Sequence, residues 1–391
     1  MNKINKITLE CTMRCSFTEK SFIWFVPREA SILCRYNLNL DLIDFMSGIP
    51  EDALCMNSYC KIVKYKEHLV LIPYSANKIT VFNVRTKMFS KIDLPPINES
   101  FMKWCKFETG FCKDNYIYLI PCRYPYILRI DMKSLEVVKC IDLFQITFDR
   151  FRKSADRVNV SAVTWDGVNT LYIGVVLIKN DEVQNTGLLK IELDTLFYEV
   201  KKMSIHIIKG MICQLDHLFI CSGDGKITVL DQRMKEEKVI SDATLKDYKS
   251  YMDMYVAYAY ACEDELTFIR YPYLDAIVWD LHKKNITKKK LIDEKIIYAG
   301  DFGNGVLIQT DKVGCFYIIE NEKCKKKKFC MESKALKMYM KIMKQMHKDV
   351  YYENTFYNLQ KWIDIVGDDD SQIMTQQYDQ CDIYQYIKNE K

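Results

Sequence analysis

A unit of roughly 47 residues recurs seven times along the 391-residue chain, and this repeat limits the possible folds more than any other feature. Each unit contains two short apolar runs rich in β-branched and aromatic side chains, which favour strands over helices. The first runs are Ile23–Val26, Leu69–Ile72, Ile117–Ile120, Leu171–Ile173, Leu218–Ile220, Leu266–Ile269 and Val306–Ile308. A solenoid of helix pairs is excluded, because its repeats would show a helical period.

The second apolar run of each unit ends in an acid or an amide. The closing residues are Asn37, Asn83, Asp131, Glu192, Asp231, Asp280 and Glu320. A short oxygen side chain at this place accepts hydrogen bonds from backbone NH groups two residues on, which starts a tight turn. With a further apolar stretch before the first run, each unit is predicted to hold four antiparallel strands, which is the pattern of a β-propeller blade.

We therefore predict an all-β fold, a seven-bladed β-propeller over residues 1–331. A β-sandwich is the alternative, but seven similar units favour radial repetition. A ring of blades has to protect its edge strands. We expect Ile4 to Cys11 to close the ring by acting as the outer strand of the last blade.

Residues 332–391 are predicted to form a helical C-terminal extension. Leu336, Tyr339 and Met343 follow one another at spacings of three and four, which is typical of a helix with one apolar face. We expect these helices to pack on or beside the propeller. The alternative is that the first, Met-rich helix docks a partner, because methionine surfaces adapt to varied ligands.

The second unit, LVLIPYSANKITVFNVRTKMFSKIDLPP from Leu69 to Pro96, resembles a kelch repeat. A strand, a loop, an apolar run with a terminal Asn, a polar turn and a Leu-Pro ending follow in the kelch order. The segment from Ile117 to Leu143 is a weaker copy, and the repeats cover most of residues 14–330. The resemblance implies a propeller of a class that mostly binds proteins or sugars and includes a few enzymes.

Composition excludes several classes of protein. The 56 basic and 52 acidic residues give a net charge of only +4, so a dedicated nucleic-acid binder is not expected. There is no apolar run long enough to cross a membrane, and no secretory signal is visible. The 16 cysteines form no CxxC pair and mostly lie in apolar stretches, so we expect reduced core thiols in a cytoplasmic, bacterial protein.

Motifs for catalysis or cofactor binding are missing from the sequence. GxSxG, HExxH, GxGxxG and CxxC do not occur, and the five histidines are not at ligand spacing. We therefore predict no catalytic residue, no cofactor and no metal site.

One tetrapeptide occurs twice, as Arg123–Tyr126 and as Arg270–Tyr273, each time between the second and third strands of a unit. In a propeller these loops emerge on one face, around the mouth of the central channel. Aromatic rings there offer stacking surfaces, and arginine offers a fork for carboxylate or phosphate. The candidate ligand-binding residues are Arg28, Tyr74, Arg123, Tyr124, Tyr126, Arg270, Tyr271 and Tyr273. The alternative is that the loops are alike by descent.

Three lysine runs are expected on the opposite face, in or after the turn between the third and outer strands. They are Lys283–Lys284, Lys288–Lys290 and Lys325–Lys328. The simpler interpretation is a solvated cluster that protects a sheet edge, and contact with an acidic partner or RNA is the alternative.

The favoured function is a non-enzymatic scaffold that recognises a protein or peptide on its Tyr/Arg-lined face. The alternative is an enzyme or binding protein for an anionic carbohydrate or another small substrate at the channel mouth. Convergent acids would discriminate the two, and the candidates are Glu108, Asp224, Asp253 and Asp301. Neither a membrane nor a nucleic acid is expected as a partner.

Overall fold

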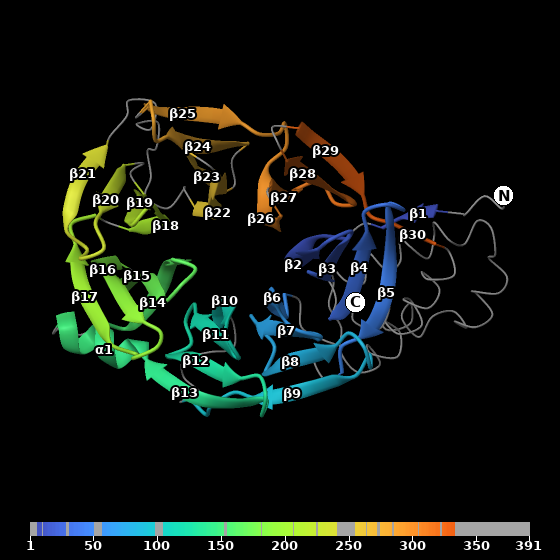
Figure 1. Cartoon of the computed structure of the whole chain (residues 1–391), viewed down its shortest axis with the longest axis horizontal. Coiled ribbons are helices and arrows are strands. Elements are labelled where there is room, and N and C mark those ends of the chain that lie inside the picture. The colour runs from blue at the N-terminus through green and yellow to red at the C-terminus, as the bar shows by residue number, and fades with distance from the viewer. Residues whose placement is uncertain are drawn as a thin grey trace, which may run out of the picture.

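The computed structural model describes a ring of seven four-stranded antiparallel blades (Figure 1), as the sequence predicts. It covers residues 6–9, 11–28, 31–50, 57–97, 105–151, 155–180, 182–205, 207–223, 226–240, 255–262, 264–271, 274–283, 285–303, 305–320 and 323–332. Strands follow one another outward in chain order within each blade. The helical extension predicted for residues 332–391 lies outside the described residues, apart from the strand residue Glu332.

Blades are numbered here from β2 onward. The innermost strands are β2 (Met13–Glu19), β6 (Tyr59–Tyr65), β10 (Phe107–Lys113), β14 (Arg157–Trp165), β18 (Ile208–Gln214), β22 (Tyr255–Cys262) and β26 (Ile296–Phe302). The second strands are β3 (Phe22–Pro27), β7 (His68–Pro73), β11 (Tyr116–Pro121), β15 (Thr170–Lys179), β19 (His217–Ser222), β23 (Glu265–Tyr271) and β27 (Gly305–Thr310).

The outer half of each blade is equally regular. The third strands are β4 (Ile32–Asn37), β8 (Lys78–Asn83), β12 (Tyr126–Asp131), β16 (Glu182–Glu192), β20 (Ile227–Leu230), β24 (Asp275–Asp280) and β28 (Cys315–Glu320). The outer strands are β5 (Leu42–Gly48), β9 (Phe89–Asp93), β13 (Glu136–Asp142), β17 (Tyr198–Met203), β21 (Glu236–Ile240), β25 (Asn285–Lys290) and β29 (Lys323–Lys328).

The turn chemistry expected after the third strands is confirmed. The Asn83 side-chain oxygen accepts hydrogen bonds from the backbone NH groups of Arg85 and Thr86, both at 2.9 Å. The Asp131 carboxylate accepts one from the NH of Lys133 at 2.7 Å. These bonds satisfy backbone donors that have no strand partner, so the closing acid or amide stabilises the turn into the outer strand.

The hydrophobic core is divided into wedges between neighbouring blades. Among the described residues there are eight clusters of buried side chains, and the seven largest each join two adjacent sheets. Gly110 on β10 shows how closely the blades approach, because a Cβ there would meet Ile72 Cδ1 of β7 at 2.2 Å. Each blade thus buries both faces only when its two neighbours are present, which makes the ring the stable unit.

The expected mode of ring closure is wrong. Blade 7 takes all four of its strands from residues 296–328, so no place is left for an N-terminal strand. Instead β1 (Lys6–Thr8) pairs antiparallel with β30 (Cys330–Glu332), and β30 pairs parallel with β5 through Met331 and Ile43. β1 and β30 therefore add strands to the outer edge of blade 1, and β30 joins it to the end of blade 7.

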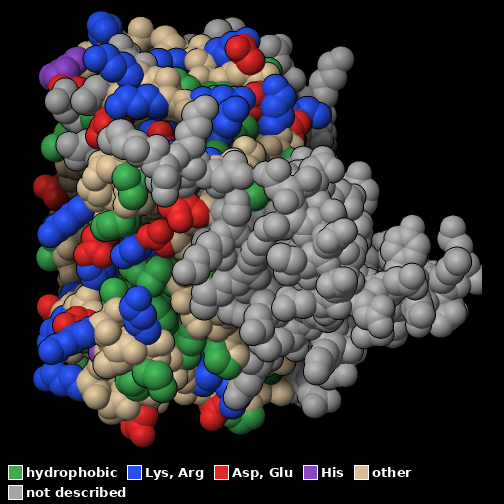
Figure 2. Space-filling view, turned by 90° about the vertical axis from the view of Figure 1, so that its right-hand side faces the viewer, with side chains coloured by type: hydrophobic (Ala, Val, Ile, Leu, Met, Phe, Trp, Pro, Cys, Tyr) green, Lys and Arg blue, Asp and Glu red, His purple; other side chains and the backbone are tan. Residues whose placement is uncertain are grey.

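The position predicted for the lysines is also corrected. Lys288–Lys290 and Lys325–Lys328 follow the turn between the third and outer strands, as expected, but they lie along the outer strands β25 and β29 and not on one face of the ring. Several pair with acids: Lys326 Nζ lies 3.3 Å from Glu294 and Lys327 Nζ 2.6 Å from Asp41. On the side of the molecule that carries β29 and β5, basic and acidic side chains are interspersed (Figure 2).

One helix was not anticipated. α1 (Leu143–Phe151) follows β13, and the Asp142 carboxylate caps it by accepting a hydrogen bond from the NH of Gln145 at 2.8 Å. Within the described ranges, no helix is long and apolar enough to cross a membrane.

The 14 cysteines that lie in described positions are free thiols. Five are buried, but Cys140, Cys262 and Cys324 are exposed, so core filling accounts for only part of the set.

Candidate functional site

A β-bulge interrupts every innermost strand at the same place. The strand pairing skips one residue of each: Arg14, Cys60, Glu108, Ser161, Lys209, Ala257 and Ile297. A bulge leaves its extra residue out of the ladder and re-aims the chain locally. The bulges therefore place one residue from each blade at the same level around the axis of the ring.

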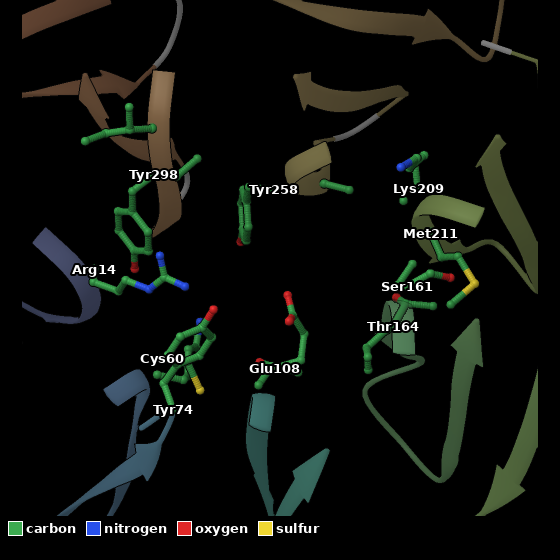
Figure 3. Close-up of a pocket in the computed structure, with 18 of the residues that line it drawn as sticks. Arg14, Cys60, Tyr74, Glu108, Ser161, Thr164, Lys209, Met211, Tyr258 and Tyr298 are labelled. Carbon is green, nitrogen blue, oxygen red and sulfur yellow. The ribbon is translucent and has the colours of Figure 1, made fainter. Parts of the chain in front are cut away.

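Six of these seven residues line a cavity of about 680 Å³ in the centre of the ring, and all seven innermost strands contribute to its wall. Figure 3 shows Arg14 and Lys209 on opposite sides of the cavity, with Glu108 directed into the space between them. The cavity is thus the central channel, and three of its five described charged side chains (Arg14, Glu108 and Lys209) occupy bulges.

One end of the cavity is marked by the residues that follow the second strands. The NH of Arg28 donates to the Thr12 carbonyl at 2.8 Å, and the NH of Tyr74 donates to the Ser58 carbonyl at 2.8 Å. These bonds place Arg28 and Tyr74 beside the start of the innermost strands, and both residues line the cavity. We call this end of the channel, with Arg14, Arg28 and Tyr74, the mouth.

Arg14 and Tyr74 form a stack at the mouth. The Arg14 guanidinium lies over the Tyr74 ring, 4.3 Å from its centroid. The Cys105 thiol lies 2.7 Å from the Tyr74 hydroxyl and donates to it, which helps to hold the ring in place. Stacking occupies the flat face of a guanidinium and leaves its N–H edge able to meet a ligand.

The charged residues that line the channel are mainly cationic. Among the described residues it holds Arg14, Arg28, Lys61 and Lys209 against the single carboxylate of Glu108. Enclosure raises the pKa of Glu108, although the charge of Arg14 and the thiol of Cys122 act to lower it. Burial lowers the pKa of Lys209. In both residues the pKa moves in the direction that favours the neutral form.

A polar network lies farther along the innermost strands. Lys61 Nζ is 3.1 Å from an Asp301 carboxylate oxygen, and the Tyr258 hydroxyl donates to the same carboxylate. The hydroxyls of Ser16 and Tyr298 are 3.0 Å apart. The charge of Lys61 is therefore offset within the protein, and the network ties β6 and β22 to β26.

The six predicted ligand-binding residues whose side chains are described do not all lie together. Arg28 and Tyr74 line the channel mouth. Tyr124 is 1% exposed, packs on Phe107 and donates its hydroxyl hydrogen bond to the Pro95 carbonyl. Arg270 is also 1% exposed and forms an ion pair with Asp275. These two side chains stabilise the interior.

Arg123 and Tyr126 are not among the described residues that line the cavity. Arg123 lies in the loop before β12 and Tyr126 is the first residue of β12, and both side chains are half-buried. Tyr271 ends β23, and Tyr273 lies outside the described residues. Ligand binding by any of the eight residues stays a prediction, but position favours Arg28 and Tyr74.

Sequence reasoning missed Arg14, Lys61, Lys209 and Tyr258 as channel residues. A signal was present, because the bulge residues recur at nearly the same intervals as the first apolar runs. Aligning the units on those runs brings Arg14, Glu108 and Lys209 to one column. Nothing local marks a bulge, however, so the column alone does not show that its side chains face the channel.

The acids proposed to mark catalysis are only partly described. Glu108 lines the channel and Asp301 is bound by Lys61, whereas Asp224 and Asp253 lie outside the described residues. In the part of the chain that the structure covers, no three His, Cys, Asp or Glu side chains are grouped as metal ligands. Neither a metal centre nor an acid pair is therefore identified.

No protein-family model matches the sequence, and no curated protein is significantly similar to it. Among solved structures, the β-propeller domain of Swd1 from Myceliophteria thermophila is 10% identical, with a TM-score of 0.53 over 80% of this chain and 97% of that one. The Dos1 propeller is 10% identical, with a TM-score of 0.54 over 80% of this chain and 79% of that one.

A third similar structure is PorZ, an essential bacterial surface component of the type-IX secretion system of Porphyromonas gingivalis. It is 11% identical, with a TM-score of 0.50, and the match covers 83% of this chain but only 39% of PorZ. At such identities the similarities show the β-propeller fold alone. The resemblance to kelch repeats is not confirmed.

Proposed function

We propose that this propeller is a non-enzymatic binding protein that recognises a protein or peptide segment at the channel mouth. The observation that carries the proposal is the stack of Arg14 on Tyr74 beside the exposed Arg28 at the opening of the central cavity. Arginine and tyrosine dominate binding energy at protein interfaces, because they combine a large apolar area with directional polar groups. The similar Swd1 and Dos1 propellers support the architecture.

The site is suited to an extended segment. The opening offers a tyrosine ring and two guanidinium groups on blades 1 and 2, and the cavity behind it accepts side chains that enter the ring. The Cys105 thiol and the stacked Arg14 restrain Tyr74 before any partner arrives. Such preorganisation reduces the entropy lost on binding.

The proposal predicts a strong effect at the mouth. A library of linear peptides displayed on phage is selected on the wild-type protein, and the affinity of the enriched peptide is measured by calorimetry. Replacing Arg28 and Tyr74 together by alanine should weaken binding by about 30-fold or more, the scale of an interface hot spot. The thermal melting curve of the variant checks that the ring is intact.

A matched control uses the same residue types at the periphery. Arg85 and Tyr198 are exposed, in a turn of blade 2 and on the outer strand of blade 4. Replacing both by alanine should leave peptide affinity unchanged. The proposal fails if no peptide is enriched, or if the control pair weakens binding as much as the mouth pair.

A small anionic substrate is the second candidate for the same mouth. A cavity volume of about 680 Å³ is in the range of small-molecule sites. Glu108, whose pKa is raised by enclosure, is the described group best placed for proton transfer. If the protein is an enzyme that acts on a small anionic substrate, Glu108→Gln should abolish turnover while the substrate still binds. In a binding protein the same variant only alters affinity.

A further inference from the structure

We propose that the channel recognises a neutral carboxamide, so that the bound segment places an asparagine or glutamine side chain between Arg14 and Glu108. This inference rests on the proposed function and gives the partner its chemical class. It follows from the juxtaposition of one guanidinium and one carboxylate that line the same cavity without a direct ion pair between them.

The first step is the placement of the two groups. Arg14 and Glu108 occupy the bulges of β2 and β10, and Cys60 occupies the bulge of the blade between them. The Arg14 and Glu108 side chains both point into the cavity (Figure 3). Among the described residues no ion pair joins them directly, and Arg14 acts on the pKa of Glu108 through its charge. A side chain that enters from the mouth therefore meets a donor and an acceptor on neighbouring parts of the wall.

The second step is the restraint on each group. The Arg14 guanidinium stacks on the Tyr74 ring at 4.3 Å, and the Cys105 thiol holds that ring through its hydroxyl. The Glu108 carboxylate accepts a hydrogen bond from the thiol of Cys122. Stacking leaves the N–H edge of a guanidinium able to donate, and a carboxylate can accept further bonds beside one thiol. The channel thus presents one restrained donor and one restrained acceptor.

The third step is the choice of ligand charge. A carboxylate near Arg14 would be repelled by Glu108, and an ammonium group near Glu108 would be repelled by Arg14. Lys61 does not change this balance, because it is paired with Asp301 at 3.1 Å, and Lys209 has an interaction of its own within the protein. A neutral group also loses less than an ion when it leaves water. The pair therefore favours an uncharged polar ligand over either ion.

The fourth step is the kind of neutral group. A carboxamide carries an acceptor oxygen and a donor nitrogen on separate atoms of one planar group. Its oxygen can accept from Arg14 while its nitrogen donates to Glu108. An apolar side chain in the same place would leave both polar groups without a partner, which costs affinity. Arg28 and Tyr74 then remain at the mouth to contact the rest of the segment.

The test uses four fluorescein-labelled octapeptides with blocked ends and anisotropy titrations with the full chain. In each peptide tyrosine alternates with one other residue, which is glutamine, glutamate, lysine or methionine. Glutamate matches glutamine in shape but carries a negative charge, and lysine carries a positive one. Methionine is similar in length but offers no strong donor or acceptor.

We expect the glutamine peptide to bind about tenfold or more tightly than the other three, the scale of a buried polar group left unpaired. Glu108→Gln should raise the affinity for the glutamate peptide relative to the glutamine peptide by about tenfold, because a like charge is lost. Arg14→Gln should raise the relative affinity for the lysine peptide in the same way. Arg85→Gln, at an exposed turn, is the control and should leave the order of the four affinities unchanged.

The two opposite shifts keep the test decisive if melting curves show that one variant does not fold. The inference is overturned if the glutamate, lysine or methionine peptide binds the wild-type protein as tightly as the glutamine peptide, or if none of the four binds. It also fails if a folded variant does not shift the preference in its stated direction. When phage selection still yields a peptide that lacks asparagine and glutamine but depends on Tyr74, the proposed function stands and only the carboxamide preference is lost.

Discussion

Replacing Arg270 by alanine is expected to lower the free energy of unfolding by about 3 kcal/mol. Its side chain is 1% exposed and forms an ion pair with Asp275 of the same blade. Removal of the guanidinium leaves a buried carboxylate whose nearest remaining cation is Lys288, with its Nζ at 3.4 Å. Urea unfolding, followed by tryptophan fluorescence and by circular dichroism, measures the loss.

Two variants make the test specific. Arg123 is the equivalent residue of the other tetrapeptide, and its side chain is half-buried in a loop. Arg123→Ala should therefore lower the free energy of unfolding by about 0.5 kcal/mol or less. Replacing Arg270 by methionine together with Asp275 by leucine should restore most of the stability, because no uncompensated charge remains. Equal, small losses for Arg123→Ala and Arg270→Ala would contradict the interior position of Arg270.

Phe329→Ala is expected to lower the free energy of unfolding by about 3–5 kcal/mol. The substitution removes a large buried side chain from the seam of the ring, where blade 7 meets blade 1. Phe329 is fully buried between β29 and β30, and its ring centroid lies 5.6 Å from Phe25 and 4.9 Å from Phe316. Its carbonyl also accepts a hydrogen bond from the NH of Leu9 at 2.7 Å. The residue thus holds blade 1, blade 7 and the N-terminal strand together.

Hydrogen exchange locates the effect. In Phe329→Ala the amides of β1, β30 and β5 should exchange faster than those of blade 4, because the closure opens before the rest of the ring. The control is Phe197→Ala, since Phe197 is 64% exposed in a turn of blade 4 and should contribute little. Uniform acceleration across all blades would show that the seam is no weaker than the other blade interfaces.

Much of the fold was predictable because its determinants are local. The alternating apolar runs assign the strands, and residues such as Asn83 and Asp131 form their turn bonds with near neighbours in the chain. Ring closure was not predictable in the same way. The short strand β30 bonds to β5, almost the whole propeller away in sequence, and no local pattern selects that partner over blade 7.

The candidate site was only partly predictable. Arg28 and Tyr74 were identified by their place after the second strand, and they line the mouth. Tyr74 is the first residue after its second strand, whereas Tyr124 is the third residue after its own. At that position the Tyr124 ring packs on Phe107 between blades. A shift of two residues is enough to turn a surface position into a core position, and composition does not reveal it.

Strand assignment, turn positions and the number of blades followed from the amino-acid order, because periodicity and turn chemistry act over a few residues. Which side chains line the channel was decided only by the tertiary structure. Arg14, Glu108 and Lys209 come from blades 1, 3 and 5, and a bulge in each innermost strand brings them to one level. Their shared electrostatic environment arises only when the ring closes and brings the three side chains to the wall of one cavity.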